Sequence, residues 1–74
     1  MNLSQCLEDL KYDIRNDGIA DDTFAMICYM TMANKARRLL RSSASNQQEV
    51  NVAREYLTMC RNSGSDGLRC VAEG

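Results

Sequence analysis

Residues 22–42 read DTFAMICYMTMANKARRLLRS, and this stretch decides the fold because it is a long, uninterrupted helical pattern without Pro or Gly. Asp21 and Asp22 open it with an N-cap and with the negative charge that a helix start favours. The inward stripe expected on this helix is Ala25, Cys28, Tyr29, Met32, Ala36, Leu39 and Leu40, while Met26, Ile27, Met30 and Ala33 cover much of the rest of its first half. A helix that is apolar nearly all round is buried on several sides, so we predict that this first half is the central element.

The preceding segment carries its own amphipathic pattern. Its apolar residues stand at spacings of four, three and four, namely Leu3, Leu7, Leu10 and Ile14. This spacing predicts a helix near residues 3–16. Asn2 offers an N-cap with Gln5 three residues later, and Gly18 suits the left-handed residue that follows a helix end.

A third helix is predicted near residues 46–62, after a long helix near 22–42. Its start signal is either Ser45 with Gln48 or Asn46 with Glu49. The expected inward stripe is Val50, Ala53, Tyr56, Leu57 and Cys60. Residues 63–67 read as a flexible turn, and residues 68–74 as a short helical turn or a tail. The pattern therefore predicts one all-α domain over residues 1–74, a small bundle of three main helices with a short C-terminal turn or tail.

The chain shows no targeting or membrane signal. Glu8, Asp9 and Asp13 interrupt the N-terminal region, which argues against a signal peptide. The longest uncharged apolar-rich run, residues 24–34, is far shorter than the roughly 18 residues that a membrane span needs. We therefore expect a soluble, cytoplasmic protein with no membrane partner.

The 4 cysteines are dispersed along the chain, at Cys6, Cys28, Cys60 and Cys70. They include no close pair such as Cys-x-x-Cys, and the chain has no His to complete a mixed zinc site. A reducing compartment disfavours disulfides. We therefore predict reduced thiols that pack as small hydrophobic groups, with Cys28 and Cys60 in apolar surroundings.

The search for catalytic or cofactor motifs finds none. General acid and base chemistry at neutral pH usually needs His, which is absent, and the carboxylates occupy surface positions and helix starts. Residues 13–24 resemble a calcium loop in part, but Arg15 stands at its third place and Phe24 where the bidentate Glu belongs. We therefore expect no enzyme activity, no metal and no cofactor.

Charge is distributed unevenly along the chain. The net charge of −1 divides into −4 over residues 1–22, +4 over residues 23–45 and −1 over residues 46–74. One interpretation places the acidic first helix beside the basic end of the second helix within one molecule. The other is that one or both charged regions face a partner and steer its approach.

The first functional hypothesis is a small non-enzymatic regulator, inhibitor or adaptor that binds a larger protein. Small cofactor-free chains of this kind are typical of bacterial or phage-encoded regulators of larger machines. The predicted protein-binding residues are Phe24, Met26, Ile27, Met30, Lys35, Arg37, Arg38 and Arg41. Because the apolar residues of helix 22–42 outnumber those that two neighbouring helices cover, we also expect a two-fold homodimer.

The second hypothesis is a nucleic-acid-binding regulator that resembles a helix-turn-helix in using two consecutive helices. The candidate phosphate contacts are Lys35, Arg37, Arg38 and Arg41, and the candidate base contacts are Asn46, Gln47, Gln48 and Asn51 at the start of the third helix. Glu49 lies among these candidate base contacts, and the turn between the second and third helices lacks Gly. Both observations argue against this interpretation.

Overall fold

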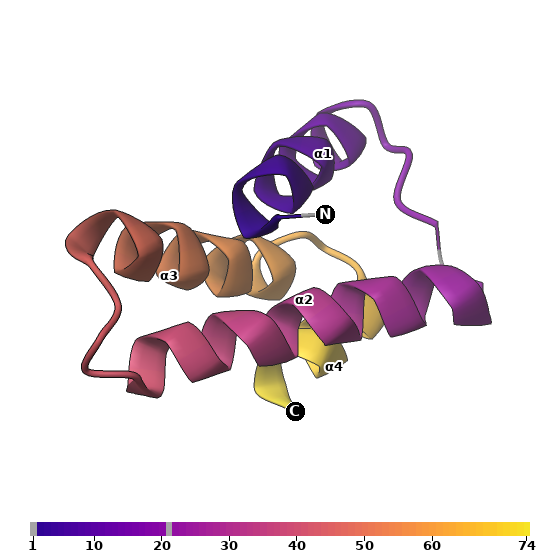
Figure 1. Cartoon of the computed structure of the whole chain (residues 1–74). Helices are drawn as coiled ribbons and strands as arrows, with labels where there is room; N and C mark the ends of the chain where they lie inside the picture. The colour runs from indigo at the N-terminus through magenta and orange to yellow at the C-terminus, as the bar shows by residue number, and fades with distance from the viewer. Residues whose placement is uncertain (1, 21) are drawn as a thin grey trace.

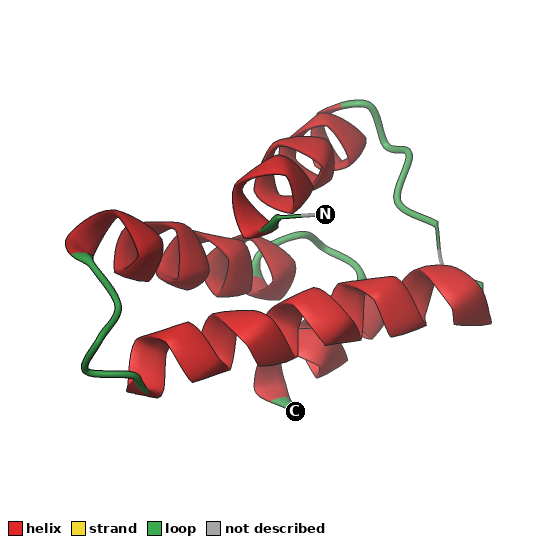
Figure 2. Cartoon of the chain, viewed as in Figure 1, coloured by secondary structure: helices red, strands yellow, loops and turns green. Residues whose placement is uncertain are grey.

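Four α-helices make up the computed structural model, which describes residues 2–20 and 22–74 (Figures 1 and 2). The helices are α1 (Leu3–Arg15), α2 (Thr23–Arg41), α3 (Gln47–Arg61) and α4 (Asp66–Glu73). No strand occurs in the described ranges. The predicted all-α class is confirmed, and the first three helices begin and end within one residue of their predicted bounds. The predicted role of Asp21 at a helix start lies outside the described residues.

The ends of α1 follow from its own side chains. Asn2 is the N-cap, and its side chain accepts a hydrogen bond of 2.7 Å from the backbone N–H of Gln5. At the other end Gly18 donates its N–H to the carbonyl of Asp13 at 2.8 Å, which closes a Schellman motif. The left-handed residue of that motif is Asp17, with φ of 54°, and not Gly18 as predicted. Asp tolerates this conformation better than most side chains do, so the turn comes one residue earlier.

The starts of α2 and α3 also follow local rules. Asp22 caps α2 by accepting from the N–H of Ala25 at 2.8 Å. At α3, Asn46 accepts from the N–H of Glu49 at 2.8 Å, and the Glu49 carboxylate accepts from the N–H of Asn46 at 3.3 Å. This reciprocal pair is a capping box, which selects the second of the two predicted start signals.

The C-terminal segment is a helix of 8 residues, α4, where the sequence predicts a turn or a tail. Ser65 caps it by accepting from the N–H of Leu68 at 3.2 Å, so Asp66 and Gly67 belong to the helix and not to the preceding turn. Leu68 and Val71 are buried against the other helices. Isolated helices this short are marginal in water, so tertiary packing is what stabilises α4.

The helices form a central pair with one helix on each side. α2 and α3 pack against each other at the centre of the molecule. α1 packs on one side of this pair and α4 on the other (Figure 1). The buried core consists of Leu3, Leu7, Leu10, Ala33, Ala36, Ala53, Tyr56, Cys60, Leu68, Val71 and Ala72. The Tyr56 hydroxyl, on α3, donates to the carbonyl of Tyr29 on α2 at 3.3 Å. α2 contributes only two alanines to this core, which suits close approach by its neighbours.

The prediction that the first half of α2 is the central element is wrong. Phe24 and Cys28 are exposed there, and near the other end Leu40 is 38% exposed although it was predicted to face inward. The reason is length, because the 19 residues of α2 span about 28 Å while α3 has 15 residues and spans about 22 Å. Only the middle of α2, at Ala33 and Ala36, is fully covered.

Arg37 ties α4 to α2. Its guanidinium donates to the backbone carbonyl of Val71 in the last turn of α4, and to the side-chain oxygen of Asn34 at 2.8 Å. A cation at a helix C-terminus is favoured by the helix dipole and satisfies a carbonyl that has no partner within the helix. Arg37, predicted to contact a partner, is therefore a structural residue of this fold.

We expect Arg37→Met to lower the free energy of unfolding by about 1–2 kcal/mol, because the aliphatic stem remains while the charged donor to Val71 is lost. Urea unfolding followed by circular dichroism measures the change. Arg54→Met is the control, since Arg54 is exposed on α3, and it should change stability by less than about 0.5 kcal/mol. Equal losses in the two variants would contradict the structural role of Arg37.

Candidate protein interface

α2 presents one continuous exposed face along its whole length. Six exposed residues at spacings of three, four, three, four and three form this outward face: Phe24, Ile27, Thr31, Asn34, Arg38 and Arg41. Residues at these spacings share one side of a helix. The face is apolar in its first turns and cationic in its last turns, with Thr31 and Asn34 between. Sequence analysis missed these two polar residues, although the spacing that links Phe24 to Arg41 includes them.

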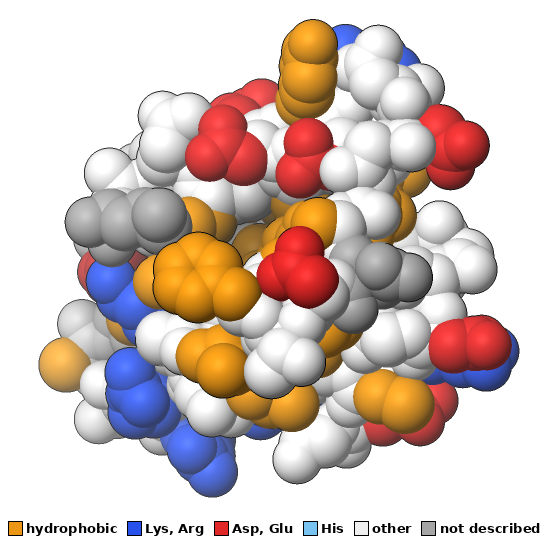
Figure 3. All heavy atoms as spheres, turned by 90° about the vertical axis from the view of Figure 1, so that its right-hand side faces the viewer, with side chains coloured by type: hydrophobic (Ala, Val, Ile, Leu, Met, Phe, Trp, Pro, Cys, Tyr) orange, Lys and Arg blue, Asp and Glu red, His pale blue; other side chains and the backbone are white. Residues whose placement is uncertain are grey.

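The apolar end of the outward face is strongly exposed. Phe24 is 77% and Ile27 58% exposed, although both are large hydrophobic side chains. Figure 3 shows hydrophobic side chains gathered at the end of the molecule where α2 begins, with a group of Lys and Arg side chains at the lower left. A shallow hollow in this region is lined by Thr23, Met26, Ile27, Met30 and Thr31. Adjoining exposed apolar side chains of this size are typical of protein contact surfaces.

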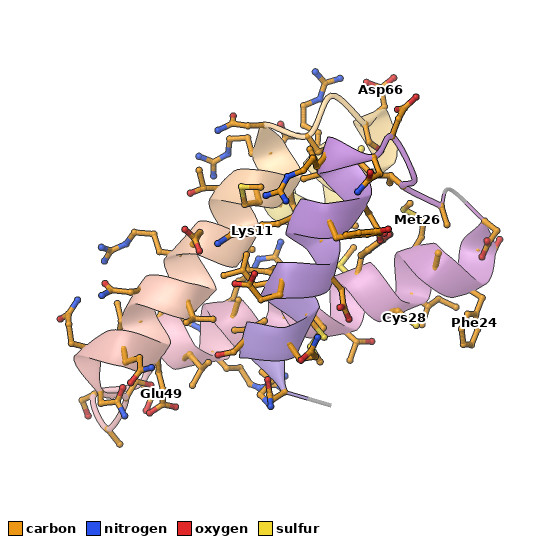
Figure 4. The ribbon with its side chains drawn as sticks, turned by 90° about the horizontal axis from the view of Figure 1, so that it is seen from above. Lys11, Phe24, Met26, Cys28, Glu49 and Asp66 are labelled. Carbon is orange, nitrogen blue, oxygen red and sulfur yellow. The ribbon has the colours of Figure 1, made fainter. Side chains whose placement is uncertain are left out.

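Met26 and Met30 belong only partly to this surface. Both are half-buried and pack against the core. The Met26 sulfur lies only 3.0 Å from the position that a Cβ on Gly67 would occupy, so Met26 packs closely on the first turn of α4. Figure 4 shows Met26 on the edge of α2 nearer Asp66 and Phe24 on the opposite edge. Helix α4, predicted only as a short helical turn or a tail, therefore covers part of the surface that sequence analysis assigned to a partner.

The basic segment of α2 is divided among three environments. Lys35 lines a hollow of about 220 Å³ beside the start of α1, with Leu39 and residues of α3. Arg37 bonds to α4, as described above. Arg38 and Arg41 are exposed on the outward face. The four cations therefore do not form one patch, and of the four only Arg38 and Arg41 are exposed to a partner.

The polar residues at the start of α3, predicted as base contacts, lie in two different places. Asn46 and Gln48 line the same hollow as Lys35, and Glu49 lies there with them. Gln47 and Asn51 are exposed and bond to each other through their side chains at 2.8 Å. The structure thus brings Lys35 together with Asn46 and Gln48, but it places an acidic side chain beside them.

The ion pairs of the described residues do not join the acidic α1 to the basic end of α2. Lys11 pairs with Glu55 at 3.1 Å and with Glu8 at 3.7 Å, and Arg69 pairs with Asp66 at 2.8 Å. The hydrogen bond from Lys11 to Glu55 raises the pKa of the Lys11 amine, and Figure 4 shows Lys11 between α1 and α3. Nothing within the described chain therefore neutralises Arg38 and Arg41 by direct pairing.

The thiols differ in environment, and the prediction of buried, structural cysteines holds fully for Cys60 and in part for Cys6. Cys60 is fully buried, and burial raises the pKa of its thiol to about 11. Cys6 is half-buried, and desolvation raises the pKa of this thiol as well. Cys28 and Cys70 are exposed. Cys28 lies at the rim of a groove between α1 and α2, so its predicted apolar surroundings cover only one side.

Two further properties concern the described residues as a whole. They contain no group of three or more side chains that would bind a metal ion. None of the described helices has the length and hydropathy needed to cross a membrane.

Comparison with protein-family models, curated proteins and solved structures gives no match. The function is therefore inferred from the chemistry of this chain's own surface.

Thiol labelling should separate the cysteines. With dithionitrobenzoate at about pH 8 we expect Cys28 and Cys70 to react at the rate of a free thiol and Cys60 to react only when urea unfolds the chain, because only the accessible thiolate is nucleophilic. In Cys60→Ala the urea-dependent reaction should fall by one thiol, leaving the half-buried Cys6, while the fast phase of Cys28 and Cys70 remains. Rapid reaction of all the thiols in the native protein would contradict the placement of Cys60.

Proposed function

We propose that this chain is a small, non-enzymatic protein-binding regulator, inhibitor or adaptor that acts by docking the outward face of α2 on a larger protein. The single observation that carries the proposal is the exposure of Phe24 and Ile27 side by side on a helix whose fully buried residues are two alanines. Removing these side chains from water stabilises a complex, and aromatic anchors supply much of the energy of protein interfaces.

Charge supports the same surface. Arg38 and Arg41 continue the outward face beyond Ile27 and extend it to about 25 Å from Phe24. Cations at the edge of an apolar contact attract an acidic partner and set its orientation. A partner helix or groove with apolar side chains at one end and carboxylates at the other would match this face, in the manner of helix-in-groove recognition.

Affinity capture from cells that carry the gene tests the proposal. We expect Phe24→Ser with Ile27→Ser to reduce the captured partner about tenfold or more, because both anchors are lost. The matched control is Tyr12→Ser, which removes a hydrophobic side chain that is 65% exposed on α1.

Circular dichroism must show that both variants keep their helices. Loss of the partner with the Phe24 and Ile27 variant alone supports the α2 face. Equal capture by this variant and the unmodified protein, or equal loss with the Tyr12 variant, would overturn it.

Nucleic-acid binding is the second candidate, and one observation favours it. Arg38 and Arg41 are exposed and form no ion pair with the described carboxylates. The polar residues of the α3 start favour it less, because Glu49 lies among them and would repel phosphate.

Mobility shifts at low salt with duplex and single-stranded probes test this candidate. If it holds, Arg38→Ala with Arg41→Ala should abolish the shift and its salt dependence, since phosphate contacts release counterions. Arg54→Ala with Arg61→Ala removes the same charge from exposed positions on α3 and should preserve the shift. Absence of a shift by the unmodified protein at micromolar concentration would exclude this function.

A further inference from the structure

We propose that a second copy of this chain covers the outward face of α2 in the free protein, through an antiparallel two-fold pairing of the two α2 helices. The inference deepens the proposed function and rests on it, since both use the same face. The grounds are the spacing of the face, the hydrogen-bonding groups at its centre and the complementary chemistry of its two ends.

The spacing of the face is symmetric. The intervals three, four, three, four and three read identically from either end, so an antiparallel copy places every outward residue opposite another one. In this register Phe24 lies opposite Arg41 of the second copy, Ile27 opposite Arg38, and Thr31 opposite Asn34. Residues at alternating intervals of three and four form the seam along which two helices pack, about 8–10 Å apart.

The centre of the face presents a donor and an acceptor that match under the two-fold axis. The Thr31 hydroxyl donates to the carbonyl of Ile27 at 2.8 Å, so its oxygen faces outward as an acceptor. The Asn34 side-chain oxygen accepts from Arg37 at 2.8 Å, which leaves the amide NH2 group as the outward donor. The Asn34 amide of each copy is therefore set to donate to the Thr31 hydroxyl of the other, which gives two equivalent hydrogen bonds.

The two ends of the face are complementary as well. The Arg41 guanidinium of one copy meets the ring of Phe24 and the carboxylate of Asp22 of the other, a cation–π contact with an ion pair beside it. The aliphatic stem of Arg38 covers Ile27 of the other copy while its charged head stays in water. A parallel pairing would instead place the arginines of one copy against those of the other, which is repulsive.

A charge-exchange experiment tests the pairing and its register. Sedimentation equilibrium of the purified protein over a concentration series should show a monomer–dimer equilibrium. Ile27→Arg, which sets two cations opposite each other, should weaken dimerisation about tenfold or more. Adding Arg38→Glu to Ile27→Arg should restore dimerisation to within about threefold of the unmodified protein. In the antiparallel register the introduced arginine at position 27 of one copy lies opposite the introduced glutamate at position 38 of the other copy, and the two attract.

Two features make the restoration specific. Residues 27 and 38 of one chain are about 16 Å apart along α2, so they cannot pair within a monomer. The control Ile27→Arg with Arg54→Glu has the same net charge, but it places the acid on an exposed position of α3 and should remain as weak as Ile27→Arg alone.

The outcomes separate this inference from the proposed function. A monomeric mass at every concentration, or equal restoration by Arg38→Glu and Arg54→Glu, would overturn the antiparallel dimer. Neither result bears on affinity capture of a larger partner, because the purified protein contains none. Conversely, a failed capture experiment leaves the sedimentation results intact.

Discussion

The length of α2 is the constraint on which the rest of the structure depends. α2 has 19 residues, whereas α1 has 13, α3 has 15 and α4 has 8. Its neighbours cover its middle, where Ala33 and Ala36 are fully buried, and they leave one side of the helix open from Phe24 to Arg41. α1, α3 and α4 all pack on the other sides of α2. The outward face is thus the side of α2 that the other described helices do not reach.

Local signals in the sequence were enough to predict the first three helices. The alternation of apolar residues located α1, α2 and α3, and side chains such as Asn2, Asp22 and Asn46 located their starts. α4 was predicted only as a short helical turn or a tail over residues 68–74. Its helical pattern is only two turns long, and Leu68 and Val71 gain their burial from residues distant in the sequence. Local patterns carry no information about such contacts.

The candidate site was predicted only in part, because a helical pattern shows which residues share a face and not which face is covered. Phe24 and Ile27, two of the predicted protein-binding residues, lie on a surface that α1, α3 and α4 leave open, whereas Met26 lies on the edge that α4 covers. The basic run divides for the same reason, since successive residues of a helix are turned by about 100°. Arg37 turns toward α4 and bonds to Val71, while Arg38 turns to the open side.

The proposed second copy and the proposed larger partner would use the same outward face of α2. In the antiparallel pairing each Arg41 meets one carboxylate, that of Asp22, while each Arg38 meets an aliphatic side chain and keeps its charge in water. A larger partner that offers an acid to both arginines and an apolar surface to Phe24 would satisfy more of the face than a second copy does. Such a partner would compete with the proposed self-association because both would need the same residues, and the better-matched charges would favour the larger partner. Self-association would then protect Phe24 and Ile27 from nonspecific contacts until that partner binds.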